Sequence, residues 1–223
     1  QVLRSSRLDS TRLLAETMSG GAWRPRVWVN ASAVGIYGSR GDEWLDEGSV
    51  AGTGFLAELC RDWEASTGPA AVAGVRVVSL RFGVVLAPDG GALAKMLPWF
   101  RRGAGGPVGD GQMWVSWIAL DELVRVVETA LSDPALDGPV NAVSPQPVRQ
   151  GEFAAALGRV LERPARIRTP GTMLRLLFGE MGEATLLASQ RVRPTALERC
   201  GFAFAPGTLE TTLLTLLRPG AGG

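Results

Sequence analysis

The sequence contains no histidine among its 223 residues. This absence excludes serine–histidine and cysteine–histidine nucleophile pairs, histidine-based zinc sites and an imidazole general base. The two cysteines, Cys60 and Cys200, lie far apart in helical patterns and lack the spacing of a metal site. We therefore expect no resident metal, and hydrolase functions lose most of their support.

The sequence also lacks a strong net charge and a long apolar run. Its net charge is +1, so nothing in the bulk electrostatics attracts nucleic acid or an anionic membrane surface. No apolar run reaches the about 18 residues that a membrane span needs, and no signal peptide is recognisable. We expect a globular, cytoplasmic protein without nucleic-acid or membrane partners.

The elements that are present alternate between strand and helix patterns. The apolar, β-branched run from Val75 to Leu80 lies between Gly74 and Gly83, which is typical of a strand buried on both faces. The patterns predict strands at 26–31, 75–81, 113–118 and 139–143, and helices at 2–17, 54–66, 92–101, 120–131 and 150–161. This order predicts an α/β fold with a doubly wound sheet, parallel except possibly at the third or last strand.

Two features expected of such a sheet are missing at its beginning. No strand precedes the helix at 2–17, and no Gly-x-Gly-x-x-Gly motif follows a strand anywhere. We expect the N-terminal strands to be missing, about the first third of a nucleotide-binding domain. A sheet cut in this way exposes a strand edge, so we expect the chain alone to be unstable and to bind nucleotide weakly.

The pattern changes from Arg163 onward. A short strand at 166–168 is followed by short helical patterns that glycine and proline separate, at 173–178, 184–187, 195–200 and 209–217. This series of short helical patterns predicts a small, mostly helical C-terminal lobe over residues 163–217. Residues 218–223 are expected to form a disordered tail.

Three segments carry a resemblance to a known family: RFGVVLAPDGGALAKMLPWF at 81–100, GAGGPVGDG at 103–111 and WIALDEL at 117–123. They resemble the epimerase-family branch of the short-chain dehydrogenase/reductases, an atypical NADP-linked subgroup with a small C-terminal domain of undefined function. The similarity runs from about Ser6 to about Leu217. It implies a partial Rossmann-like NAD(P)-binding epimerase domain at 1–162, NADP or NAD as the cofactor, and a small-molecule substrate.

The resemblance also implies site residues. Ser32 and Tyr37, just after the strand at 26–31, are the catalytic candidates. The candidates for cofactor binding are Arg7, Ala31, Gly83, Val84 and Val85. Those for the substrate side are Phe55, Lys95, Gly105 and Gly106, with the loop at 103–111 able to cradle an anion through backbone N–H groups. Because ligands bind at the carboxyl ends of parallel strands, we expect Ser32, Tyr37, Phe55 and the Gly83 strand end to meet in one cleft.

Purely structural roles stay open as alternatives for several of these residues. Ser32 is equally well explained as a hydroxyl that caps its loop. Arg7 is also explained as a surface residue of an amphipathic helix, and the segment at 81–85 as a buried strand end.

The proton-transfer pair of the short-chain dehydrogenases is absent. Those enzymes place a Tyr and, four residues later, a Lys on one helix face, where the ammonium lowers the phenol pKa. Tyr37 and Lys95 are the only residues of their kinds, so no such pair exists in this chain. On the helix at 54–66 its positions hold either Phe55 and Leu59 or Leu56 and Cys60, depending on the alignment.

Two functions therefore remain open. The first is an NAD(P)-dependent oxidoreductase or epimerase-like enzyme whose proton comes from Tyr37, from Ser32 through water, or from a loop carboxylate such as Asp42. The second is a non-catalytic NADP(H)-binding redox sensor or partner-binding protein. The sequence names no substrate and no oligomeric state.

Overall fold

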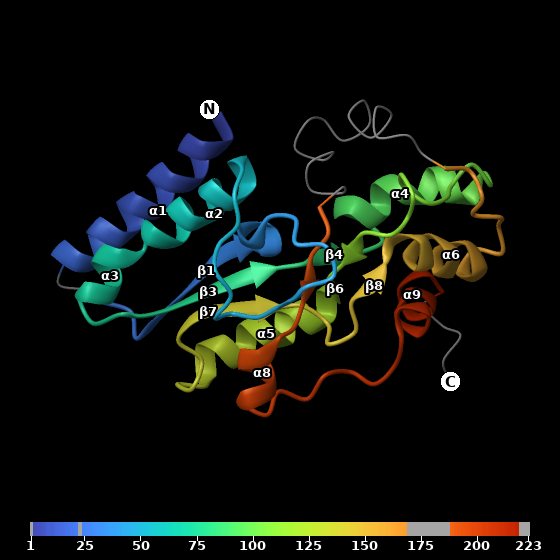
Figure 1. The fold of residues 1–223 in the computed structure, drawn as a ribbon. Helices are drawn as coiled ribbons and strands as arrows, with labels where there is room; N and C mark the ends of the chain where they lie inside the picture. Colours follow the sequence, from blue (N-terminus) through green and yellow to red (C-terminus); the bar gives the residue numbers. More distant parts are fainter. Residues whose placement is uncertain (1, 22–23, 169–187, 219–223) are drawn as a thin grey trace.

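The computed structural model describes residues 2–21, 24–168 and 188–218. Its centre is a parallel sheet of three strands in the order β1-β3-β7, shown in Figure 1. The strands are β1 (Val27–Ala33), β3 (Arg76–Phe82) and β7 (Gly138–Ala142). Side chains from Val77 to Arg81 are buried, as the apolar run predicted for the middle strand. The predicted α/β fold class is confirmed.

Helices cover both faces of this sheet (Figure 1). One face carries α1 (Val2–Gly20), α2 (Phe55–Ala65) and α3 (Gly68–Val72), and the other carries α5 (Leu120–Ser132) and α8 (Thr195–Arg199). Apolar side chains of β3, β7, α5 and α8 form one buried cluster, since strands that are buried on both faces need apolar cover on each side. The helices predicted at 2–17, 54–66, 120–131 and 195–200 are confirmed.

A second apolar core lies beyond the carboxyl end of β3. The chain continues through β4 (Val84–Leu86) into α4 (Gly91–Arg101), and α6 (Gln150–Val160) and α9 (Leu209–Leu217) belong to the same layer. Leu93, Leu97 and Phe100 of α4 pack in one buried cluster with α6 and α9. Because α9 closes a core that α4 and α6 begin, the C-terminal segment packs onto the preceding part of the chain.

The strand predicted at 113–118 is two strands in two different sheets. β5 (Trp114–Val115) pairs antiparallel with β8 (Val148–Arg149), whereas β6 (Trp117–Ala119) pairs parallel with β4. Ser116 lies between them, and its hydroxyl donates to the Gln190 carbonyl and accepts from the Val192 amide. These side-chain bonds at Ser116 accompany the change of partner, which local periodicity does not reveal.

A short parallel pair ties the C-terminal segment to the loop after β1. η1 (Val34–Tyr37) leads to β2 (Trp44–Leu45), which pairs with β9 (Arg191–Val192). The Arg191 guanidinium lies between two indoles, 3.9 Å from the Trp44 ring centroid and 4.1 Å from that of Trp114. Arg193 and Arg149 extend the stack on its two ends, at 4.0 and 4.2 Å.

One prediction for the C-terminal part is wrong, because residues 166–168 form no strand. Arg218, the first residue of the predicted disordered tail, donates to the Val160 carbonyl and the Glu162 carboxylate, and disorder of the tail stays a prediction. The helices predicted at 173–178 and 184–187 and the tail beyond 218 lie outside the described residues. The domain boundary at 162 stays a prediction. Within the described ranges, no helix has the length and apolar character needed to cross a membrane.

Candidate functional site

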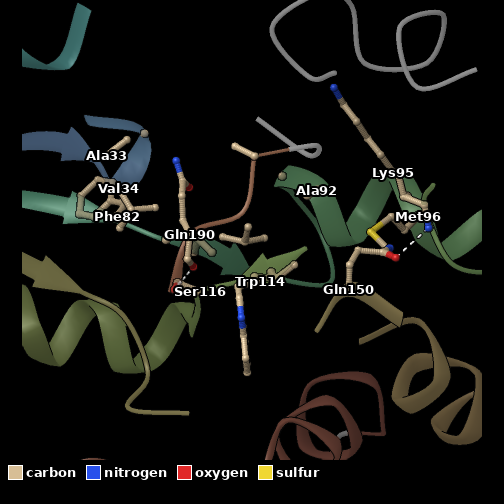
Figure 2. Close-up of a pocket in the computed structure, with 18 of the residues that line it drawn as sticks. Ala33, Val34, Phe82, Ala92, Lys95, Met96, Trp114, Ser116, Gln150 and Gln190 are labelled. Carbon is tan, nitrogen blue, oxygen red and sulfur yellow. Dashed lines mark hydrogen bonds between the residues drawn. The ribbon is translucent and has the colours of Figure 1, made fainter. Parts of the chain in front are cut away.

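A cavity of about 750 Å³ opens at the carboxyl ends of β1 and β3. Its sheet wall consists of Ser32–Gly35, Leu56, Cys60 and Phe82–Val85. Its α4 wall consists of Ala92, Lys95, Met96, Trp99, Phe100, Ala104–Gly106, Val108 and Ile167. Figure 2 shows Ala33, Val34 and Phe82 on one side and Ala92, Lys95 and Met96 on the other. Both the size and the place are those of a ligand site in an open α/β sheet.

The structure brings most of the predicted site residues to this cavity. Ser32, Gly83, Val84 and Val85 lie in the sheet wall, and Lys95, Gly105 and Gly106 lie in the α4 wall. The wall from β1 and β3 thus holds cofactor-side candidates, and the facing wall holds substrate-side candidates. Their individual roles stay predictions.

Four predicted residues do not line the cavity. Arg7 lies on α1 with its guanidinium 5.2 Å from the Trp63 ring centroid, and Ala31 lies within β1 opposite Leu80. Phe55 is exposed at the first turn of α2, so the prediction that it forms an apolar wall of the cleft is wrong. The fourth residue is Tyr37.

The Tyr37 side chain is fully buried and belongs to a polar network behind the sheet wall. Its hydroxyl donates to Asn141 Oδ1 at 2.7 Å and accepts from Arg81 Nη1 at 2.9 Å. Burial raises the pKa of Tyr37 to about 12, although the Arg81 charge opposes the shift. The prediction that Tyr37 points into the cleft is wrong, because its hydroxyl is hydrogen-bonded to Asn141 and Arg81 in the protein interior. This placement favours a structural role.

The same network holds Ser32 in place. Arg81 makes a two-pronged ion pair with Glu64, with both N–O distances at 2.8 Å. The Ser32 hydroxyl donates to Glu64 Oε1 at 2.6 Å. Ser32 is 2% exposed and still borders the cavity, so one hydroxyl links the cavity to the ion pair behind it. Sequence reasoning missed the Glu64–Arg81 pair.

The face of α2 toward the cavity carries the residues that stand in place of the absent Tyr–Lys pair. Leu56 and Cys60, four residues apart, both border the cavity, whereas Phe55 and Leu59 do not. The alignment that places Leu56 and Cys60 at the positions of the pair is the one consistent with this geometry. Burial raises the pKa of Cys60 to about 11, so the thiol stays protonated at neutral pH. The spacing 56, 60 and 64 is a sequence signal that also puts Glu64 on this face.

The loop carboxylate Asp42 does not line the cavity. Its Oδ1 atom accepts from Trp114 Nε1 and from Arg149, both at 2.8 Å, and its side chain is 71% exposed. These hydrogen bonds hold the pKa of Asp42 below its usual range. A carboxylate with this placement and this lowered pKa is a poor proton donor to a cavity ligand, so the structure gives no support to Asp42 as the proton source.

The glycines at the cavity are required by packing against protein. A Cβ atom on Gly83 would lie 2.5 Å from the Ser116 carbonyl oxygen, and one on Gly105 would collide with the Phe100 ring. In the loop at 103–111, the amides of Gly103, Ala104 and Gly111 donate to backbone carbonyls. The amide of Val108 donates to Gln150 Oε1 at 2.7 Å, as Figure 2 shows. These four donors are unavailable to an anion, and an anion cradle built from the other amides of the loop, including those of Gly105 and Gly106, stays a prediction.

Comparisons with known proteins bear on the family and the fold of the chain. An epimerase family protein of Mycobacterium bovis is 44% identical over 221 residues, which are 99% of this chain and 73% of that protein. The chain belongs to the epimerase family. A family described as "Domain of unknown function (DUF1731)" matches residues 169–216.

Two solved structures extend the likeness to three dimensions. The human epimerase family protein SDR39U1, solved with NADPH, has a TM-score of 0.90 and 31% identity, covering 97% of this chain and 75% of that chain. A nucleoside-diphosphate sugar epimerase from Corynebacterium glutamicum has a TM-score of 0.77 and 38% identity, covering 97% of this chain and 42% of that chain. The Rossmann-like epimerase architecture expected from the sequence is confirmed.

Proposed function

We propose that this epimerase-family chain is part of an NADPH-dependent oxidoreductase or epimerase-like enzyme that acts on a small substrate. The observation that carries the proposal is the cavity at the carboxyl ends of β1 and β3, with a largely apolar sheet wall and a separate facing wall. The human relative solved with NADPH supports the choice of cofactor. NADP over NAD, a cytoplasmic location and a role for Arg7 in cofactor binding stay predictions.

The sheet wall fits the nicotinamide end of such a cofactor. Val34, Gly35 and Phe82 to Val85 offer small apolar surfaces on which a planar ring can lie. Bound NADPH supplies a hydride. Ser32 borders the same wall, and in this proposal its hydroxyl turns from Glu64 to a substrate oxygen and relays a proton to that oxygen from water, so that the serine itself stays protonated.

A non-catalytic, NADP(H)-binding redox sensor is the second candidate. The specific observation in its favour is that Leu56 and a protonated Cys60 occupy the face of α2 where a Tyr–Lys pair would act. Such a protein would bind the cofactor and signal its redox state without turning over a substrate.

The test is a fluorescence titration of the full-length protein with NADPH and NADH, followed by a screen of small carbonyl compounds for NADPH oxidation. We expect saturable NADPH binding and turnover that falls about 10²-fold in Ser32→Ala, the scale for loss of general acid–base catalysis. Saturable binding without turnover on any compound favours the sensor. Absence of saturable binding of either nucleotide overturns both candidates.

A further inference from the structure

Several of the polar groups at the cavity are already used by the protein. Among the described residues that line it, five uncharged polar side chains each make at least one hydrogen bond to the protein. Ser32 donates to Glu64, Ser116 donates to the Gln190 carbonyl, and Trp114 Nε1 donates to Asp42. The Gln190 amide donates to the Gly38 carbonyl, and the Gln150 carbonyl oxygen accepts from Val108. Figure 2 shows the hydrogen bonds of Ser116 and Gln150 as dashed lines.

The α4 wall is, in contrast, rich in apolar and aromatic surface. Met96, Trp99, Phe100, Val108 and Ile167 all border the cavity. Trp99 is 41% exposed and Ile167 is 55% exposed, so large apolar groups beside the cavity remain in contact with solvent. Exposed apolar groups that border a concave site mark a surface that a ligand covers. The charged members of the lining, Lys95 and Arg168, are exposed side chains and add no buried charge.

These two observations discriminate between substrate classes. Each sugar hydroxyl that loses water without gaining a partner costs about 1–3 kcal/mol, and a hexose carries several. An apolar ring of similar size gains about 25 cal/mol for each Å² that it removes from water. The α4 wall therefore disfavours a sugar and favours a flat apolar body, to which the flexible Met96 side chain can adapt.

We propose that the substrate is an apolar, ring-bearing aldehyde or ketone rather than a nucleotide sugar, with its ring on the α4 wall. This inference rests on the proposed function. In the reaction the carbonyl carbon gains the hydride of NADPH, the carbonyl π bond breaks, and the oxygen takes a proton that water ultimately supplies. The products are an alcohol and NADP⁺. An apolar carbonyl compound is a different substrate class from the nucleoside-diphosphate sugar in the name of the Corynebacterium relative.

The experiment compares two probes on the full-length protein by isothermal titration calorimetry, without cofactor. The probes are 2-acetylnaphthalene, an apolar bicyclic ketone, and UDP-glucose. We expect the ketone to bind at least about tenfold more tightly, equivalent to about 1.4 kcal/mol. Equal or tighter binding of UDP-glucose overturns the inference.

A matched pair of variants locates the binding. Ala92→Trp places a bulky ring into the α4 wall, and we expect it to weaken ketone binding about tenfold or more while circular dichroism reports a folded protein. Val72→Trp adds the same side chain at a position that is 92% exposed and far from the lining, and it should bind as the wild type does. Undiminished ketone binding by folded Ala92→Trp contradicts the proposed location.

The outcome separates the two proposals. Ketone binding without NADPH binding overturns the proposed function and leaves the ligand class standing. NADPH binding without ketone binding overturns the ligand class alone.

Discussion

The sheet wall of the cavity is backed by a buried ionic network, whereas the α4 wall is backed by an apolar core. Behind the sheet wall, Arg81 donates to Glu64 and Tyr37, and Ser32 donates to Glu64, through directional bonds of 2.6–2.9 Å. Behind the α4 wall, Leu97 and Phe100 pack against α6 and α9 without such bonds. Directional bonds fix atomic positions, while apolar contacts tolerate small displacements, so the first wall suits a cofactor and the second an adaptable substrate surface.

The largest expected effect comes from breaking the ionic network. Arg81→Met leaves the Glu64 carboxylate without its counter-charge, although the Glu64 side chain is only 16% exposed. Removal of one partner from a buried pair costs about 3–5 kcal/mol, because an uncompensated charge remains. We expect a loss of this size in the free energy of unfolding, measured by urea denaturation of the full-length protein.

The double variant Arg81→Met/Glu64→Gln is the control for this prediction. It removes both charges, so its destabilisation should be smaller than that of Arg81→Met alone. A double variant that loses the sum of the two single effects would show that the pair is not coupled. The contrast between a sheet wall backed by coupled charges and an α4 wall backed by an apolar core would then fail.

The second prediction uses the fact that Tyr37 is the only tyrosine. Tyrosinate absorbance therefore reports this residue alone, and we expect a folded-state pKa of about 12, above the ordinary value of 10.0, because burial disfavours the phenolate. A raised pKa means that the folded state holds the proton more tightly. Stability is then unaffected below pH 10 and falls as pH rises from about 10 to about 12, by about 3 kcal/mol at most.

Tyr37→Phe provides the matched control. The variant should lose less stability at alkaline pH than the wild type, because no phenol is left to ionise at this position. At neutral pH its free energy of unfolding should be lower by about 1–3 kcal/mol, because the Asn141 carbonyl oxygen and Arg81 each lose a partner. A tyrosinate midpoint near the ordinary value would show that the hydroxyl reaches solvent. The structural role assigned to it would then fail.

The sequence was sufficient for the parts of the fold that repeat locally. The buried run at 75–80 and the amphipathic patterns of α2 and α5 were found because strand and helix periods are visible within ten residues. The strand at 113–118 was misread because its two halves pair with β8 and with β4, and a local pattern carries no information on partners.

The candidate site was predictable only at the level of loops. Strand ends placed Ser32 and Gly83 at the cavity, since topology brings carboxyl ends together. The orientation of Tyr37 was not predictable, because Asn141 is 104 positions away in the chain. Phe55 and Leu56 are neighbours on α2, and a rotation by one residue decides which of them faces the cavity.

The smallest expected effect tests the apolar wall. Gly105 has no positive φ, so Gly105→Ala meets no backbone strain, but its Cβ atom would collide with the ring of Phe100, which is 3% exposed. Overpacking of this kind costs about 1–3 kcal/mol. Gly90→Ala is the control, because Gly90 has extended backbone, at φ −153°, and open space around its Cβ position. It should change the free energy of unfolding by less than about 0.5 kcal/mol. Urea denaturation of both variants measures the difference. Equal free energies of unfolding would mean that the Phe100 ring shifts without cost to accommodate the added methyl group. The α4 wall would then be less tightly packed than its apolar core implies.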